Sequence, residues 1–249
     1  MNKTILTAAG PHMMPVLENF SLPSFEQFGR RNDYDVTVIR HQNDSLMRKD
    51  SLAVAARWQK MKLIKDALAT YDIVLWLDAD VILQRFDEDP LLYLEEDHYQ
   101  GLVLHHVPAE NRVNPNTGVW LLRREARTFN FLDKIESIGL PKGRWADQGA
   151  VMRALDWECG DEHYSGARYP SDDRQLDGVA WLPTGWNQPY TLNRPNPEAY
   201  EGRPLVSHPH AVHFMSMTIK DRMKEMDTFN HAHPIEKRNG YHGAYALCS

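Results

Sequence analysis

The sequence predicts one α/β domain with a mostly parallel sheet flanked by helices. Strand-like and helix-like stretches alternate through the first half of the chain, a pattern typical of parallel sheets covered by helices. Residues 73–77 are apolar on both faces of an extended strand, as in the central strands of such sheets. Since no linker-like stretch divides the 249 residues, we expect a single domain spanning 1–249.

The first half of the chain supplies four expected strands and two expected helices. Short apolar runs bounded by turn residues predict the strands, and apolar residues at spacings of three and four predict the helices. The helix at 51–70 is the clearest, with Trp58 and Met61 on its apolar stripe and Asp50 or Ser51 as its cap. In chain order the elements are the strand 4–8, a helix 14–28 interrupted at Pro23, the strand 35–40, the helix 51–70, and the strands 73–77 and 101–107.

The second half of the chain is looser and richer in loops. Gly139 is a typical C-terminal cap, so we expect a helix to end there. The stretch 186–209 is rich in Pro and Asn and predicts a long loop. The expected elements are the strand 119–122, the helices 125–138 and 146–155, the strands 179–182 and 211–215, and the helix 219–229.

Composition limits the classes of function. Hydrophobic residues make up 42% of the chain and charged residues 25%, which is typical of a globular protein with a real core. The formal net charge of -6 argues against a general nucleic-acid binder. No apolar run is long enough to span a bilayer. Cys159 and Cys248 form no CxxC pair, which favours a reduced, cytoplasmic setting.

Two aspartates, Asp78 and Asp80, directly follow the strand 73–77. Ligands of open α/β sheets bind at the carboxyl ends of the strands, so these side chains stand where a substrate would bind. Carboxylate oxygens suit Mg²⁺ or Mn²⁺, and such ions bridge phosphate oxygens. A bare D-x-D is common by chance, but the apolar runs on either side of this one favour a metal site over an ordinary polar loop.

Other residues leave two interpretations open. Lys60, on the helix 51–70, is either part of a solvated face or a nucleotide contact. Trp186 either stacks on a sugar or packs in the core. His208, His210 and His213 suggest a zinc cluster as an alternative, although His210 and His213 would point to opposite faces of a strand.

Four short elements, in their order and spacing, resemble a known family. They are Trp58-Gln59-Lys60 leading to Trp76-Leu77-Asp78-Ala79-Asp80, then Asn116-Thr117-Gly118, Trp145-Ala146-Asp147-Gln148 and His213-Phe214. Together they look like the yeast α-galactosyl- and α-mannosyltransferases and the plant xyloglucan xylosyltransferases. The resemblance implies a GT-A type fold. Residues 1–123 would form a nucleotide-sugar and metal-binding half, and residues 124–249 a loop-rich acceptor-side half.

The resemblance also implies roles for single residues. Asp78, Asp80 and His213 would bind the metal, and the imidazole favours Mn²⁺ over Mg²⁺. Asp147 and Gln148 would lie beside the anomeric carbon and the acceptor as catalytic residues. The candidate contacts of the nucleotide-sugar are Ala8, Lys60, Asp78, Ala79, Asn116, Gly118 and Lys220.

The chain departs from that family in two respects. The family carries Gly and Cys between its H-F element and its lysine, whereas residues 215–219 here contain neither, which weakens the assignment of Lys220. The family's membrane-anchored stem has no counterpart in this sequence. We therefore expect a cytoplasmic enzyme closer to bacterial or viral relatives, without a transmembrane segment.

The activity that the resemblance implies is metal-dependent transfer of a sugar from a nucleotide-diphosphate donor to a hydroxyl acceptor, with retention of the anomeric configuration. The donor would be a UDP-sugar, with a GDP-sugar possible, and the acceptor a glycan or another hydroxyl compound. Two alternatives stay open. One is a nucleotidyltransferase, for which Gly10-Pro11-His12 is a poor phosphate loop. The other is a nucleotide-sugar- or glycan-binding protein without catalysis.

Overall fold

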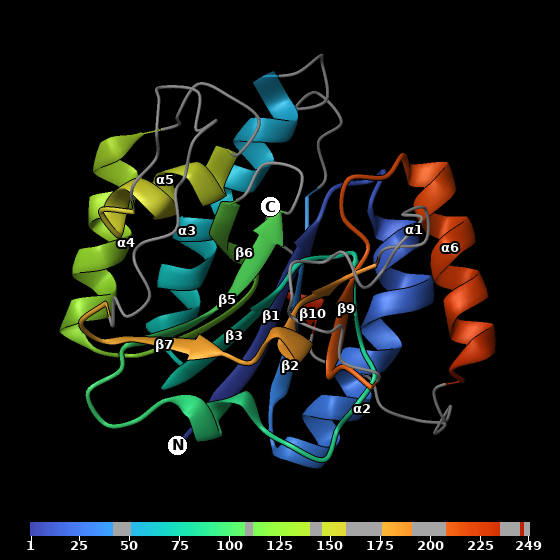
Figure 1. Cartoon of the computed structure of the whole chain (residues 1–249), viewed down its shortest axis with the longest axis horizontal. Coiled ribbons are helices and arrows are strands. Elements are labelled where there is room, and N and C mark those ends of the chain that lie inside the picture. The colour runs from blue at the N-terminus through green and yellow to red at the C-terminus, as the bar shows by residue number, and fades with distance from the viewer. Residues whose placement is uncertain are drawn as a thin grey trace.

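The computed structural model describes residues 1–41, 51–107, 112–139, 146–157, 176–190, 208–234 and 245–246. A seven-stranded sheet lies between two groups of helices (Figure 1). One face carries α3 (Ser51–Leu68), α4 (Ala126–Ile138) and α5 (Ala146–Ala154), and the other carries α1 (Met14–Val16), α2 (Leu22–Asn32) and α6 (Ile219–Ala232). A second sheet of three strands lies on the side of α6. The cap expected at Asp50 falls outside the described residues.

The large sheet is mostly parallel, as expected. Its strands lie in the order β10 (Tyr245–Ala246), β2 (Asp35–Arg40), β1 (Lys3–Ala9), β3 (Ile73–Leu77), β6 (Arg112–Arg123), β5 (Gln100–Val107) and β7 (Val179–Leu182). Strand β6 runs antiparallel to both of its neighbours, and the other four pairings are parallel. The strand expected at 119–122 is the end of the much longer β6.

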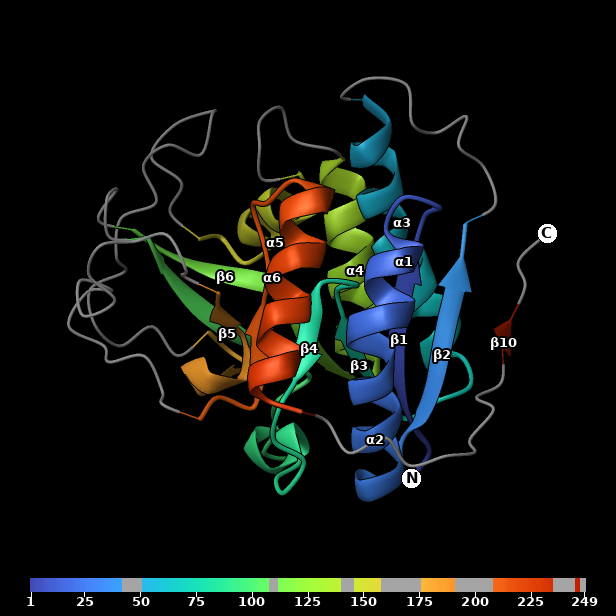
Figure 2. The same cartoon turned by 90° about the vertical axis from the view of Figure 1, so that its right-hand side faces the viewer.

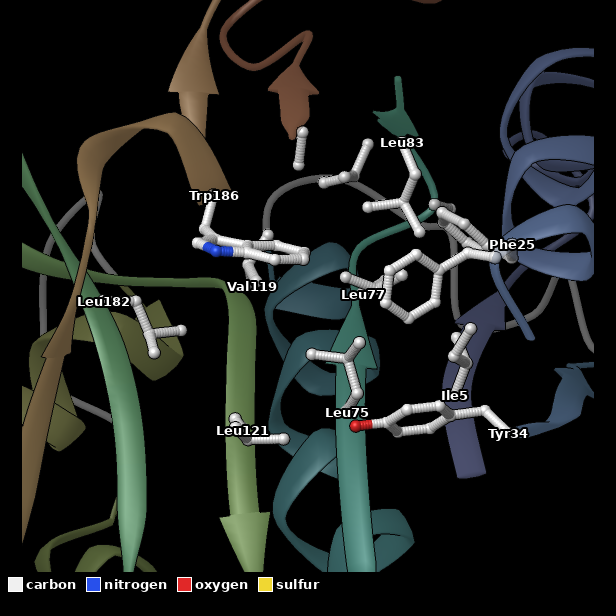
Figure 3. Close-up of a cluster of buried hydrophobic side chains, with 14 of the residues drawn as sticks. Ile5, Phe25, Tyr34, Leu75, Leu77, Leu83, Val119, Leu121, Leu182 and Trp186 are labelled. Atoms are coloured by element: carbon white, nitrogen blue, oxygen red, sulfur yellow. The ribbon is translucent and has the colours of Figure 1, made fainter. Parts of the chain in front are cut away.

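Strand β3 divides the core into two layers. Successive side chains of a strand point to opposite faces, and all five residues of β3 are buried. Trp76 faces the cluster formed by α3 (Ser51–Leu68), α4 (Ala126–Ile138) and α5 (Ala146–Ala154). Leu75 and Leu77 face Phe25 of α2 (Leu22–Asn32) on the other side (Figure 3). The expected central strand is therefore confirmed.

The first helix is one continuous run and is not broken at Pro23. It comprises α1 (Met14–Val16), a π-helical turn η1 (Leu17–Ser21) and α2. Pro23 directly follows the π-helical turn, so its missing N–H falls where the regular α-helical hydrogen-bond pattern is already interrupted. The helix continues past the expected end at residue 28 and stops at Asp33, which has a left-handed φ of 60°.

The small sheet was not expected from the sequence. It consists of β4 (Val81–Leu83), β9 (Ala211–His213) and β8 (Gln188–Pro189), with η5 (Thr184–Trp186) just before β8. The prediction of a long loop at 186–209 is therefore wrong at its start, where η5 ends and β8 lies. Residues 191–207 lie outside the described part. Helix α6 (Ile219–Ala232) packs beside this sheet and α1 (Figure 2).

Two smaller features complete the fold. A short 3₁₀ turn, η3 (Pro90–Tyr93), connects β4 to β5. Within the described ranges, no helix is both long and apolar enough to cross a membrane.

A buried tyrosine makes the free energy of unfolding depend on pH in the alkaline range. Tyr34 donates a hydrogen bond to Asp89 Oδ1 at 2.7 Å. Burial, together with the charge of Asp89, raises the pKa of Tyr34 above its ordinary value. In the unfolded chain the phenol loses its proton near pH 10. The native state therefore holds one more proton above that pH, and the free energy of unfolding falls as pH rises.

We expect Tyr34→Phe to lower the free energy of unfolding by about 1 kcal/mol at pH 7, because one hydrogen bond is lost. Between pH 9.5 and 11 the variant should lose stability less steeply than the unchanged protein. Urea unfolding at a series of pH values measures both effects. Parallel pH profiles for the two proteins would contradict the role assigned to Tyr34.

Candidate metal centre and active site

The turn between β3 and β4 carries Asp78 and Asp80 and is held from two sides. Asp78 N–H donates to Gly118 O of β6 at 2.8 Å, and Val81 N–H closes the turn on Asp78 O at 3.1 Å. Ser21, in the π-helical turn η1, donates its hydroxyl to Ala79 O at 2.8 Å. The backbone of the acidic pair is therefore fixed by the sheet and by the first helix.

Pairing of the two short strands brings His213 to this turn. Strands β4 and β9 are antiparallel, with Val81 opposite His213. Phe214 N–H then donates to Asp80 O at 2.9 Å. His213 Nε2 consequently lies 3.3 Å from Asp80 Oδ1 and 3.9 Å from Asp78 Oδ2. Residues 133 positions apart in the chain share one site because two three-residue strands pair.

Each aspartate has one oxygen engaged by a donor and turns the other toward His213. Asp78 Oδ1 accepts from Trp76 Nε1 at 2.7 Å and lies 3.0 Å from Lys60 Nζ. Asp80 Oδ2 lies 3.1 Å from Arg222 Nε. One ligand atom from each of Asp78, Asp80 and His213 lies within 4.8 Å of the others.

The three residues fit a divalent cation. Two carboxylate oxygens and one imidazole nitrogen form the donor set, which suits Mn²⁺ better than Mg²⁺ because Mg²⁺ strongly prefers oxygen. Three protein ligands leave further coordination positions for a substrate or water. Among the described residues the other group of metal-ligand type is Glu95, Asp97 and His98, whose two carboxylates are exposed.

The buried Lys60 and the partly buried Arg222 balance the carboxylates. Burial opposes ionisation of Asp80, but His213 and Arg222 outweigh it and hold the pKa of Asp80 below its ordinary value. Burial also opposes the charge of Lys60, yet Asp147 and Asp78 raise its pKa above the ordinary value. The ion pairs Lys60–Asp147 and Arg222–Asp80 are thus both formed at neutral pH.

Lys60 links the acidic turn to α5. It is only 4% exposed, so the solvated-face interpretation is wrong. Its Nζ lies 2.8 Å from Asp147 Oδ2 and donates to Thr117 O at 3.2 Å, besides its contact with Asp78. Thr117 Oγ1 in turn donates to Asp147 Oδ2 at 3.1 Å. Three of the elements noted in the sequence therefore meet at one ammonium group.

The remaining polar residues form a connected network beside the metal site. Asn116 Nδ2 donates to Gln148 Oε1 at 3.2 Å, and Gly118 N–H donates to Asn116 Oδ1 at 2.8 Å. A Cβ on Gly118 would lie 2.2 Å from His213 Cε1, so only glycine permits the imidazole its position. The residues Asp147 and Gln148 are both buried. Trp145 of the same element lies outside the described residues.

Two expected nucleotide contacts, Ala8 and Lys220, lie outside the network of side chains around Asp78, Asp80 and His213. Ala8 lies two residues beyond Leu6, which pairs with Trp76, so it stands at the same edge of the sheet as Asp78. Lys220 is exposed in the first turn of α6.

Arg222, which the sequence interpretation missed, is the cation of α6 that contacts Asp80. Residues two apart on a helix point about 200° apart, so the side chains of Lys220 and Arg222 leave α6 in nearly opposite directions. Arg222 shares the spacing of four and three with Met226 and Phe229, which are buried. That spacing was the available signal.

The histidine and tryptophan alternatives are settled by packing. His210 stacks on Trp186 with ring centroids 4.4 Å apart and places Nε2 3.4 Å from Glu88 Oε1. It does not approach the ligand atoms of His213, so the described residues contain no cluster of His208, His210 and His213. Trp186 is fully buried and packs in the core (Figure 3).

No protein-family model and no curated protein sequence matches the chain. Solved structures do resemble it. A glycosyltransferase involved in the glycosylation of the major capsid of PBCV-1 is 14% identical with a TM-score of 0.56, over 92% of this chain and 100% of that one. The bifunctional glycosyltransferase WbbM is 12% identical with a TM-score of 0.54, over 90% of this chain and 49% of that one.

The glycosyltransferase GlyE of Streptococcus pneumoniae TIGR4 is 14% identical with a TM-score of 0.52, over 94% of this chain and 64% of that one. These likenesses concern the fold. They confirm the expected α/β architecture and its resemblance to GT-A type glycosyltransferases.

Proposed function

We propose that this chain is a metal-dependent glycosyltransferase that moves a sugar from a nucleotide-diphosphate donor to a hydroxyl acceptor. The observation that carries the proposal is the convergence of Asp78, Asp80 and His213 in a fold shared with glycosyltransferases. This trio stands at the carboxyl end of β3, where ligands of α/β sheets bind. A cation at the diphosphate would stabilise the leaving group of such a transfer, and the trio offers ligands for one.

The ion proposed for this site is Mn²⁺, with Mg²⁺ as the second choice. Asp78 and Asp80 would each offer the ion one oxygen. The other oxygen of Asp78 is engaged by Lys60 and Trp76, and the other oxygen of Asp80 by Arg222. A bound ion would stabilise the negative charge of the departing diphosphate as a Lewis acid.

The donor site proposed around this trio uses residues from several strands. Asn116 and Gly118 would line the sugar pocket, and Ala8 and Ala79 the nucleotide side of the sheet edge. Lys60 would act by holding Asp78, since its own donors are already used. The contact of Lys220 with the diphosphate stays a prediction. UDP is the preferred nucleotide and GDP the second.

Asp147 and Gln148 are the proposed catalytic residues. Lys60 and Thr117 fix Asp147 Oδ2, and Asn116 orients the amide of Gln148. Both side chains are thus held in place before a substrate arrives, which reduces the reorganisation needed in the transition state. We propose transfer with retention by a front-face route, in which the leaving phosphate takes the proton of the acceptor hydroxyl. No residue is proposed as a covalent nucleophile.

Both halves of the chain contribute to the proposed site. Residues 1–123 supply the acidic turn and Lys60, and residues 124–249 supply Asp147, Gln148 and His213. A single domain whose second half faces the acceptor fits this division. The acceptor, a glycan or another hydroxyl compound, and a cytoplasmic location remain predictions.

The alternatives are separable by one experiment. A nucleotidyltransferase would release pyrophosphate from a nucleoside triphosphate, and a binding protein would hold a nucleotide-sugar unchanged. A screen of UDP- and GDP-sugars for Mn²⁺-dependent release of the nucleoside diphosphate tests the proposal. Binding of UDP with Mn²⁺ but no hydrolysis or transfer with any donor would favour the binding protein.

We expect Asp80→Asn to lower Mn²⁺ affinity by more than about 100-fold, since loss of a direct ligand should exceed the 10–100-fold cost of losing an outer partner. Donor hydrolysis should disappear. Calorimetric titration of Mn²⁺ and the hydrolysis assay measure the two effects. His213→Gln, which leaves the Arg222–Asp80 pair intact, should give the same result in a stably folded protein.

Asp97→Asn is the matched control, because it makes the same chemical change in the exposed group of Glu95, Asp97 and His98. It should leave Mn²⁺ affinity and hydrolysis unchanged. Undiminished turnover by Asp80→Asn, or by the unchanged protein with its Mn²⁺ chelated, would refute the metal-dependent proposal.

We expect Gly118→Ala to weaken Mn²⁺ binding by at least about 10-fold, because the new methyl group would displace the His213 ring. Crowding should also lower the free energy of unfolding by about 1–3 kcal/mol. Gly101→Ala provides the control, since its Cβ would crowd Leu94 and Leu182 in the core away from the metal ligands. Equal Mn²⁺ affinities in the two variants would contradict the placement of His213.

A further inference from the structure

The orientation of the His213 ring can be deduced from one backbone donor. Gly118 N–H can only donate, and its partner 2.8 Å away in the Asn116 side chain must therefore be the oxygen, Oδ1. The same Oδ1 lies 2.8 Å from the side chain of Asn187. Two oxygens at that distance would repel, so the Asn187 atom is the amide nitrogen Nδ2.

The amide of Asn187 then has its oxygen on the far side. Asn187 Oδ1 lies 3.0 Å from His213 Nδ1. A carbonyl oxygen only accepts hydrogen bonds, so Nδ1 of the ring carries the proton. The other ring nitrogen, Nε2, is the one that faces Asp80 Oδ1 at 3.3 Å and Asp78 Oδ2 at 3.9 Å. In a neutral ring protonated at Nδ1, the lone pair lies on Nε2.

Asn187 is itself held rigidly. It is fully buried, and its backbone N–H donates to Thr184 O at 3.1 Å. Its carbonyl oxygen accepts from His105 Nε2 at 2.6 Å. The side chain therefore has no freedom to follow His213 if the ring turns. Both polar atoms of this amide are used, one for the N-T-G element and one for the imidazole.

The geometry points to Asn187 as a positioning residue for the metal site, which holds His213 with Nε2 toward Asp78 and Asp80. This role rests on the proposed function, because it concerns the cation site proposed there. Ligating histidines are commonly fixed through their second nitrogen by an acceptor of this kind, and the loss of such a partner weakens metal binding. Asn187 would not touch the donor, the acceptor or the ion.

Two substitutions separate this role from ordinary packing. Asn187→Leu keeps the approximate volume but removes the acceptor for His213 Nδ1. Asn187→Asp keeps that acceptor and replaces the amide donor to Asn116 with a second carboxyl oxygen. We expect Mn²⁺ affinity to fall about 10–100-fold in Asn187→Leu and to stay within about 3-fold of the unchanged protein in Asn187→Asp.

Asn114→Leu is the matched control. Asn114 is buried in β6 two residues before Asn116, and neither polar atom of its side chain has a hydrogen-bond partner among the described residues. The same amide-to-alkyl change there breaks no hydrogen bond to this part of the chain, and Mn²⁺ affinity should not change. Thermal unfolding of every variant shows whether a loss of affinity merely follows a loss of stability.

The experiment is calorimetric titration with Mn²⁺ alone, combined with NMR of ¹⁵N-histidine-labelled protein without metal. In the unchanged protein the spectrum should show His213 protonated at Nδ1, and in Asn187→Leu this state should no longer predominate. Equal Mn²⁺ affinity in Asn187→Leu and the unchanged protein would overturn the role of Asn187 while leaving the metal site standing. Failure of the unchanged protein to bind Mn²⁺ would overturn the proposed function and this role with it.

Discussion

The pairing of β4 with β9 is the constraint on which the proposed site depends. Strand β4 begins at Val81, directly after the acidic turn, and Val81 lies opposite His213. A register shift of one residue would turn His213 to the other face of the small sheet. The hydrophobic cluster of Ile82, Val212 and Phe214 with α6 buries the far side of these strands and so fixes the register. Packing of α6 therefore supports the position of His213, a proposed metal ligand that lies outside this helix.

A second constraint is electrostatic. Asp80, Asp147 and Lys60 are buried together, and burial of charges is costly unless each finds a partner. Lys60 spans Asp78 and Asp147, while Arg222 serves Asp80. These pairs leave one oxygen of each metal-site aspartate directed at His213. Burying these ion pairs costs desolvation free energy. In return, the side chains of the site are in place before a ligand arrives.

The acidic turn and its strand could be predicted from the sequence because both signals are local. Residues 73–77 form a continuous apolar run, and the position of Asp78 and Asp80 after it needs no knowledge of distant segments. The family resemblance, carried by the order of four short elements, predicted that Asn116, Asp147 and His213 lie near this turn. The structure brings these residues together, although the pattern alone gave no distances.

The rest of the site could not be predicted because it depends on contacts between distant segments. Strand β4 has three residues, too few for a periodic signal. Asn187 lies 71 positions from Asn116, with which it bonds, and its segment looked like a loop. For Lys60 the sequence left a solvated helix face and a nucleotide contact open, because its partner Asp147 comes from the second half of the chain. For Arg222, the resemblance drew attention to Lys220 and away from the buried stripe of α6.

Anomalous diffraction from crystals grown with Mn²⁺ and UDP would show directly whether the ion binds at the acidic turn. We predict one strong manganese peak between Asp78, Asp80 and His213, with the diphosphate of UDP in contact with the ion. Manganese and diphosphate bound elsewhere in the molecule, with this trio lacking the ion, would contradict this prediction.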